Sequence, residues 1–177
     1  MKAFLVFLSL FSVKAFAIET VEYVDLSRYV GTWYQVANKP QWFEPDVCVC
    51  ARQSLTPLES GLVGVYNSCN EDGPKGKIND IQGTAENDDP QTNSKFVVDF
   101  GLPFKGSYWI IGLDEEYRWA VVSDKRGRSL YILSKTPYLA EDLYQAALEA
   151  ASQQVSLEGL EETYHGEDCA YPQVPRQ

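Results

Sequence analysis

The chain has 177 residues, of which 45% are hydrophobic, 13% aromatic and 23% charged, as expected for one globular domain with a sizeable core. This composition excludes collagen-like and disordered chains. The 15 Lys and Arg residues stand against 25 Asp and Glu, a formal charge of −10 that argues against nucleic acid as a partner. The 11 Tyr, 8 Phe and 4 Trp either fill a tight core or line an apolar cavity.

The first 17 residues have the features of a secretory signal peptide. Lys2 gives a positive start, residues 3–13 form an apolar run, and Ala15-Phe16-Ala17 has the pattern of a cleavage site. The run is shorter than the about 20 residues of a membrane span. We expect a signal peptide over 1–17 and a single domain over 18–177, periplasmic if the host is bacterial and otherwise secreted. No cysteine stands near Ala17 to carry a lipid anchor.

The four cysteines, Cys48, Cys50, Cys69 and Cys169, are an even number, which predicts two disulfides in an exported chain. A metal site is not favoured, because the close pair is spaced Cys-x-Cys and the one histidine is His165. In a regular strand Cys48 and Cys50 point to the same face, so each should bond elsewhere.

Short runs rich in Val, Ile, Tyr, Trp and Thr recur between turn signals and predict eight antiparallel strands. A helix is then expected over 138–153 and a short strand over 160–164. One face of the helix is marked by Leu139, Leu143, Ala146, Ala147, Ala150 and Ala151. The eight strands are predicted over 31–38, 47–55, 61–69, 77–86, 94–101, 107–113, 117–123 and 129–135.

Eight consecutive antiparallel strands leave exposed edges unless they close into a barrel. An eight-stranded barrel has an interior that holds one small ligand, as in a calyx. A two-sheet sandwich satisfies the strand pattern as well, so the pattern alone leaves both architectures open.

Three motifs occur in the chain in the same order, and at the same strand positions, as in one known protein family. The segment Gly31-Thr32-Trp33-Tyr34 is similar to the Gly-x-Trp-Tyr opening of the first strand. The runs 113–122, Leu-Asp-Glu-Glu-Tyr-Arg-Trp-Ala-Val-Val, and 130–137, Leu-Tyr-Ile-Leu-Ser-Lys-Thr-Pro, resemble the second and third motifs, and 100–111 resembles a connecting segment of bacterial members. The likeness is to the lipocalin family, covers about residues 25–170 and is strongest to the bacterial outer-membrane lipocalins and the apolipoprotein D branch. It implies an all-β, eight-stranded up-and-down barrel with a C-terminal helix packed outside.

The resemblance also implies structural roles at the closed end of the barrel. Trp33 should close the bottom, with the cation of Lys135 over its ring, where the family usually has Arg; we expect Lys to give a slightly weaker base because it lacks the planar fork. In the apolipoprotein D branch a second-strand cysteine ties down the C-terminal tail, which implies Cys48–Cys169 and Cys50–Cys69, with the swapped pairing nearly equal to it. The structural motif positions are Gly31, Trp33, Asp114, Tyr117 and Lys135.

The ligand implied by the resemblance is a small hydrophobic molecule, most simply a fatty acid or a lysophospholipid, carried or stored in the calyx. No cofactor is required, and the protein is expected to be a monomer or a weak homodimer. We assign to the barrel interior the face of the fifth strand that carries Phe96, Val98 and Phe100 and the face of the sixth that carries Trp109 and Ile111. The opposite face of each strand fits the pattern too. The expected ligand contacts are Tyr29, Phe96, Val98, Phe100, Trp109, Ile111 and Tyr131.

Two other classes of function, a barrel enzyme and an interaction module, are alternatives to the carrier. A barrel enzyme acting on a lipophilic substrate is disfavoured, because the sequence has no hydrolase, phosphate-loop or zinc-protease motif and because His165 lies in an acidic tail where solvent exposure is expected. An interaction module would use Trp42 and Phe43 in the loop 40–45 to dock on a membrane surface or a protein. The alternative role of these two aromatics is a lid across the calyx.

Overall fold

The computed structural model describes residues 17–42, 44–45 and 47–175. The expected signal peptide, except for Ala17, and Phe43 of the mouth loop lie outside the described residues. Within them, no helix is long and apolar enough to cross a membrane.

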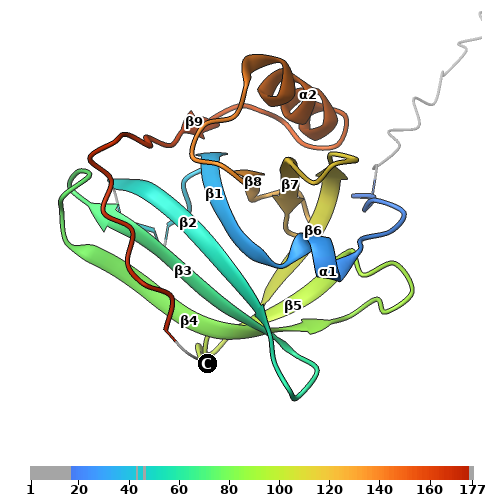
Figure 1. Cartoon of the computed structure of the whole chain (residues 1–177). Helices are drawn as coiled ribbons and strands as arrows, with labels where there is room; N and C mark the ends of the chain where they lie inside the picture. The colour runs from blue at the N-terminus through green and yellow to red at the C-terminus, as the bar shows by residue number, and fades with distance from the viewer. Residues whose placement is uncertain (1–16, 43, 46, 176–177) are drawn as a thin grey trace, which may run out of the picture.

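The described chain folds into a closed antiparallel barrel (Figure 1). Strands β2 to β8 follow one another in sequence order, and β1 pairs with both β2 and β8, so the sheet closes on itself. Closure removes the free edges that an open eight-stranded sheet would present, and it decides between barrel and sandwich in favour of the barrel. The eight barrel strands are β1 Gly31–Asn38, β2 Cys48–Pro57, β3 Val63–Glu71, β4 Ile78–Asn87, β5 Lys95–Asp99, β6 Gly106–Leu113, β7 Trp119–Ser123 and β8 Leu130–Ser134.

In the described part of the chain, two helices and a short ninth strand complete the fold. Helix α1, Leu26–Tyr29, precedes β1 and begins at Asp25, whose carboxylate accepts a hydrogen bond from the Ser27 N–H at 2.9 Å. This single turn is too short to produce a helical periodicity and was not expected from the sequence. Helix α2, Glu141–Ser152, packs outside the barrel on β6, β7 and β8, and β9, Glu161–Glu162, pairs with the end of β1.

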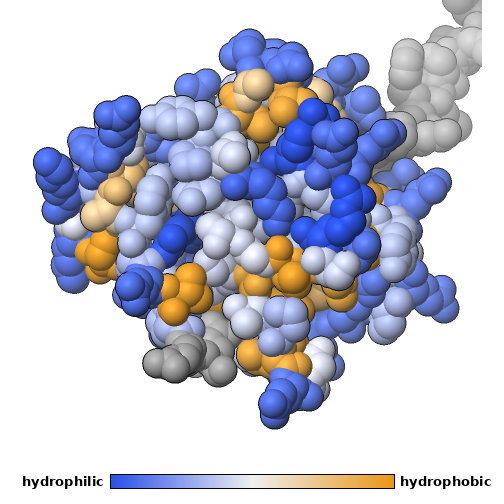
Figure 2. Space-filling view, viewed as in Figure 1, coloured by the Kyte–Doolittle hydropathy of each residue, from blue (hydrophilic) through white to orange (hydrophobic). Residues whose placement is uncertain are grey.

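The apolar residues form two separate clusters. The first fills the barrel around Trp33, Val65, Phe96 and Ile110. The second lies between the barrel wall and α2 and includes Ile111, Trp119, Ala147 and Ala151. The predicted helix face is therefore the one against the barrel, except that Ala146 is exposed. On the molecular face in Figure 2, hydrophobic residues form small patches separated by hydrophilic ones.

The disulfide pairing carried over from the apolipoprotein D branch is wrong, and the swapped pairing is the one that the structure has. Cys48 bonds Cys69 on the neighbouring strand, and Cys50 bonds Cys169 in the C-terminal tail. The reason is a bulge: the register of β2 against β3 shifts between Val49 and Arg52, and Cys50 has a φ of 54°. The extra residue turns Cys50 toward the tail, where its N–H donates to the Tyr164 carbonyl at 2.8 Å. Cys48 lies on the same face of the sheet as Cys69 of β3, to which it bonds.

The C-terminal tail after β9 runs across the outside of the barrel (Figure 1). It is joined to β2 by the Cys50–Cys169 disulfide and to the β3–β4 loop by the Ala170 N–H, which donates to the Pro74 carbonyl at 3.3 Å. His165 is 6% exposed, not solvated as the sequence suggested. Its Nε2 lies 2.8 Å from the Gln35 carbonyl, so Nε2 carries the proton and donates, and Nδ1 accepts from the Tyr171 hydroxyl at 2.8 Å. Burial lowers the pKa of His165. The histidine therefore fastens the tail to β1.

Candidate functional site

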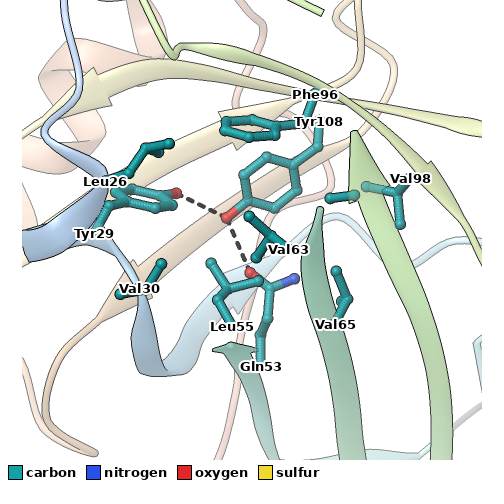
Figure 3. Close-up of a pocket in the computed structure, with 11 residues that line it drawn as sticks. Leu26, Tyr29, Val30, Gln53, Leu55, Val63, Val65, Phe96, Val98 and Tyr108 are labelled. Atoms are coloured by element: carbon teal, nitrogen blue, oxygen red, sulfur yellow. Dashed lines mark hydrogen bonds between the residues drawn. The ribbon is translucent and has the colours of Figure 1, made fainter. Parts of the chain in front are cut away.

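The interior of the barrel contains an apolar pocket beside α1 (Figure 3). Its free volume is about 20 Å³, enough for roughly one water molecule. None of its lining residues is charged, and the lining comes from the α1 segment and from β2 to β6. The residues are Leu26, Tyr29, Val30, Gln53, Leu55, Val63, Val65, Ala85, Phe96, Val98 and Tyr108.

Three of these residues form a polar relay across the apolar lining. The hydroxyls of Tyr29 and Tyr108 are 2.7 Å apart, and the Tyr108 hydroxyl donates to Gln53 Oε1 at 3.0 Å. Figure 3 draws both bonds, with the three side chains converging from α1, β6 and β2. Burial raises the pKa of both tyrosines, so both hydroxyls stay protonated at neutral pH.

The pocket lies at the closed end of the barrel, where the first and third motifs meet. The Trp33 indole N–H donates to the Tyr29 carbonyl at 2.7 Å. Lys135 Nζ lies 3.9 Å from the Trp33 ring centroid and donates to the carbonyls of Tyr29 and Val30, each at 3.0 Å. Lysine thus bonds the backbone carbonyls although it lacks the fork of arginine. Burial lowers the pKa of Lys135 to about 8, so the ammonium is mainly protonated at pH 7.

The second motif closes the same end from the β6–β7 turn. Asp114 accepts from Arg118 Nε at 2.7 Å and Nη2 at 2.8 Å and from the Arg118 backbone N–H at 3.0 Å. These bonds lower the pKa of Asp114. Tyr117, which has a φ of 62°, accepts a bond from the Asp25 N–H at 2.8 Å, and the Arg28 guanidinium lies 4.1 Å from its ring centroid. The motif therefore anchors α1 across the closed end.

Gly31 connects α1 to β1 with a φ of 99°, a conformation that residues with a Cβ adopt only under strain. The glycine of the first motif is thus required by the turn that brings Trp33 into the barrel.

Three of the seven expected ligand contacts line the pocket: Tyr29, Phe96 and Val98. Tyr29 belongs to α1 and not to the first strand. Phe100 packs against the interior cluster farther along the barrel, where Gly83 leaves room for its ring: a Cβ on Gly83 would lie 2.6 Å from Phe100 Cδ1. These positions agree with the period-two alternation predicted for β5.

The predicted inner face of β6 is wrong. Trp109 and Ile111 pack in the cluster beneath α2, outside the barrel, whereas Tyr108 and Ile110 face the interior. Both faces of β6 are apolar because one contacts the barrel core and the other contacts the helix, so alternation alone does not distinguish them. Tyr108 and Gln53 were therefore not among the expected contacts.

The open end of the barrel carries a half-buried carboxyl group, that of Glu44. Tyr131 packs against the interior cluster, and its hydroxyl donates to Glu44 Oε1 at 3.0 Å. Glu44 Oε2 accepts from Asn38 Nδ2 at 2.8 Å and from the Gln41 N–H at 3.1 Å. Burial raises the pKa of Glu44. These bonds hold the β1–β2 loop to β1 and β8, a role that no motif of the sequence indicated.

Trp42, at the tip of the same loop, is 84% exposed, and its ring centroid lies 6.4 Å from that of Phe104 in the β5–β6 loop. Trp42 is therefore not packed as a lid within the barrel.

A second and more open groove, of about 690 Å³, lies outside the barrel between α2 and the tail. Its lining combines apolar residues, among them Val36 and Leu139, with acidic ones, among them Glu141, Glu162 and Asp168. The enclosed apolar pocket is the better candidate for a hydrophobic ligand. No group of residues in the described part of the chain could hold a metal ion.

Comparison with known proteins agrees with this geometry. Residues 24–161 match the lipocalin-like domain family. Temperature-induced lipocalin-1 of Arabidopsis thaliana is 30% identical over 142 residues, which are 76% of this chain and 75% of that protein. Outer membrane lipoprotein Blc of Escherichia coli K12 is 33% identical over 138 residues, 77% of this chain and 76% of that protein. Apolipoprotein D of Rattus norvegicus is 30% identical over 129 residues, 67% of this chain and 64% of that protein.

Among solved structures, insecticyanin from the tobacco hornworm Manduca sexta has a TM-score of 0.68 at 20% identity, covering 87% of this chain and 88% of that one. Lobster apocrustacyanin A1 has a TM-score of 0.66 at 14% identity, covering 89% and 96%. These two likenesses concern the fold. With the three motifs gathered at one end of a closed barrel and a family match over most of its length, the chain belongs to the lipocalin family, whose members bind small hydrophobic ligands and are generally not enzymes.

Proposed function

We propose that this lipocalin binds a single-chain lipid, a fatty acid or a lysophospholipid, and carries or stores it outside the cytosol. The observation that carries the proposal is the pocket itself, whose lining is almost wholly aliphatic and aromatic and has no charged residue. Burial of each methylene group stabilises a complex by roughly 0.8 kcal/mol, so one long chain supplies enough free energy for tight binding.

The uncharged lining also bears on the orientation of such a lipid. An ionised head group buried without a partner costs several kcal/mol, on the order of the whole binding energy. The head group should therefore stay at the open end and the hydrocarbon chain should enter the barrel. Because the free volume beside α1 is only about 20 Å³, chain entry requires that lining side chains move.

The test is a titration of delipidated protein with a fluorescent fatty acid. We expect saturable binding at one site per chain. Ala85→Leu, which adds bulk inside the pocket, should weaken binding, whereas Ala146→Leu makes the same change on the exposed side of α2 and should not. Absence of saturable binding, or equal effects of the two substitutions, would contradict binding in the calyx. Native mass spectrometry of protein from its own host would then identify any resident ligand.

The two disulfides support an extracellular or periplasmic location, since such bonds persist in oxidising compartments. Detection of a mature chain that begins at Ile18 in an exported fraction would test both the location and the expected cleavage after Ala17.

Shallow contact of the open end with a membrane is a second candidate, favoured by the exposed Trp42 and Phe104 side chains on neighbouring loops. Flotation with neutral liposomes should be lost in Trp42→Ala and kept in Tyr23→Ala, another exposed aromatic far from these loops in the chain. Unchanged flotation of Trp42→Ala would exclude this contact.

A further inference from the structure

The polar relay inside the pocket has a defined direction. The Tyr108 hydroxyl donates its one proton to Gln53 Oε1, so in the contact between the two tyrosine hydroxyls Tyr29 is the donor. The oxygen of Tyr29, a lining residue of the pocket, then retains acceptor capacity, and the Gln53 amide nitrogen retains donor capacity. An otherwise apolar cavity thus offers both kinds of hydrogen-bonding group.

A further buried acceptor lies beside the relay. Asn67 is the direct partner of Gln53 in the β2–β3 register, and it follows Val63 and Val65, which line the pocket, on the same face of β3. Its Oδ1 is buried and has no hydrogen-bond partner among the described residues. An acceptor in that condition favours a ligand that donates a hydrogen bond.

The hydrogen-bonding groups of the pocket distinguish a ligand end that is a hydrocarbon, a carboxylate or a hydroxyl. A plain hydrocarbon end leaves the acceptors of Tyr29 and Asn67 unpaired. A carboxylate cannot donate, and the pocket lining offers it no cation. A hydroxyl donates and accepts at once and carries no charge, so it fits both sets of groups.

We propose that the calyx selects an aliphatic ligand that presents a neutral hydroxyl to the relay of Tyr29, Tyr108 and Gln53. The inference rests on the proposed binding of a single-chain lipid and specifies its buried end. Two ligands share this chemistry: a fatty alcohol that enters head first, and an acyl chain hydroxylated at its far end that enters tail first while its carboxylate stays at the open end.

Three probes of equal chain length test the proposal: lauric acid, its ω-hydroxy derivative and lauryl alcohol, each displacing a fluorescent fatty acid. At least one hydroxylated probe should bind about tenfold more tightly than lauric acid, the effect of one added hydrogen bond. Preference for the alcohol indicates head-first entry, and preference for the ω-hydroxy acid indicates tail-first entry.

Tyr29→Phe removes the hydroxyl oxygen that would accept from the ligand and should abolish the preference while leaving the affinity for lauric acid within about twofold. Gln53→Leu, which removes the amide nitrogen that would donate to the ligand, provides an independent variant should Tyr29→Phe fail to fold. Tyr144→Phe, which removes a tyrosine hydroxyl on α2 outside the barrel, should keep the preference. Equal binding of all three probes to the native protein, or a preference that survives in a folded relay variant, would overturn the inference. Saturable binding of the fluorescent fatty acid with no such preference leaves the proposed function standing, whereas no binding of any probe refutes both.

Discussion

Lys135 Nζ lies 3.9 Å from the centroid of the Trp33 ring and donates to the carbonyls of Tyr29 and Val30 at 3.0 Å. One side chain of the third motif thus joins the first strand to the end of α1, next to the pocket. This relationship explains how residues more than a hundred positions apart fix the closed end of the barrel.

Replacement of Lys135 by Met should lower the free energy of unfolding by about 1 kcal/mol. The substitution removes hydrogen bonds to two carbonyls, and this loss outweighs the gain from no longer burying a charged ammonium, the burial that lowers the pKa of Lys135. Lys135→Arg should retain most of the stability. Lys95→Met, at a looser contact 5.3 Å from the Trp109 ring centroid, is the matched control and should lose less. Urea denaturation measures all three, and an equal loss at Lys95 would contradict a special role for Lys135.

The two disulfides should differ in their contribution to stability. Cys50 and Cys169 are separated by 119 residues and Cys48 and Cys69 by 21, so removal of the first bridge should cost about 4–5 kcal/mol and removal of the second about 3 kcal/mol in the chain-entropy model. Paired Cys→Ser variants and denaturation measure the two losses. Peptide mapping of the non-reduced protein gives the pairing directly, and a Cys48–Cys169 peptide would contradict the structure.

His165 should make the tail sensitive to acid. Its folded pKa is lowered below the ordinary 6.5, so below that pH the unfolded chain takes up a proton that the folded chain does not. The free energy of unfolding should therefore fall as the pH drops through about 6.5 and continue to fall until the folded pKa is reached. His165→Gln, which keeps a donor and an acceptor but does not titrate, should lack this component between pH 7.5 and 5.5. The same pH dependence in both proteins would refute the assignment.

Asp114 should contribute to stability at neutral pH and lose this contribution in acid. Its pKa is lowered chiefly by the hydrogen bonds from Arg118, so the contribution is present above the ordinary value of 3.8 and disappears as the pH falls through the folded pKa. Asp114→Asn should cost about 1 kcal/mol at pH 7 and correspondingly less near pH 3. Denaturation of both proteins at the two pH values tests this, and a difference that does not shrink in acid would argue against the ionised carboxylate.

Much of the architecture was readable from local patterns. The strand from Gly31 to Asn38 has the predicted bounds, and the barrel, the outer helix and the closed-end role of Trp33 are confirmed. Period-two alternation and turn residues are local properties, and they predict the structure correctly wherever a strand is regular and has one apolar face. For the same reason Phe96 and Val98 were placed correctly in the pocket.

The sequence by itself determined the family, the number of barrel strands and the apolar character of the interior. Only the tertiary structure decided the disulfide partners, the inner face of β6 and the relay from Tyr29 to Gln53. A bulge of one residue at Cys50 changes which side of β2 meets the tail, and it leaves no signal in composition. The choice between Tyr108 and Trp109 depends on where α2 packs, because a strand covered on both faces is apolar on both. Those choices are made by contacts between distant segments, which a local pattern does not contain.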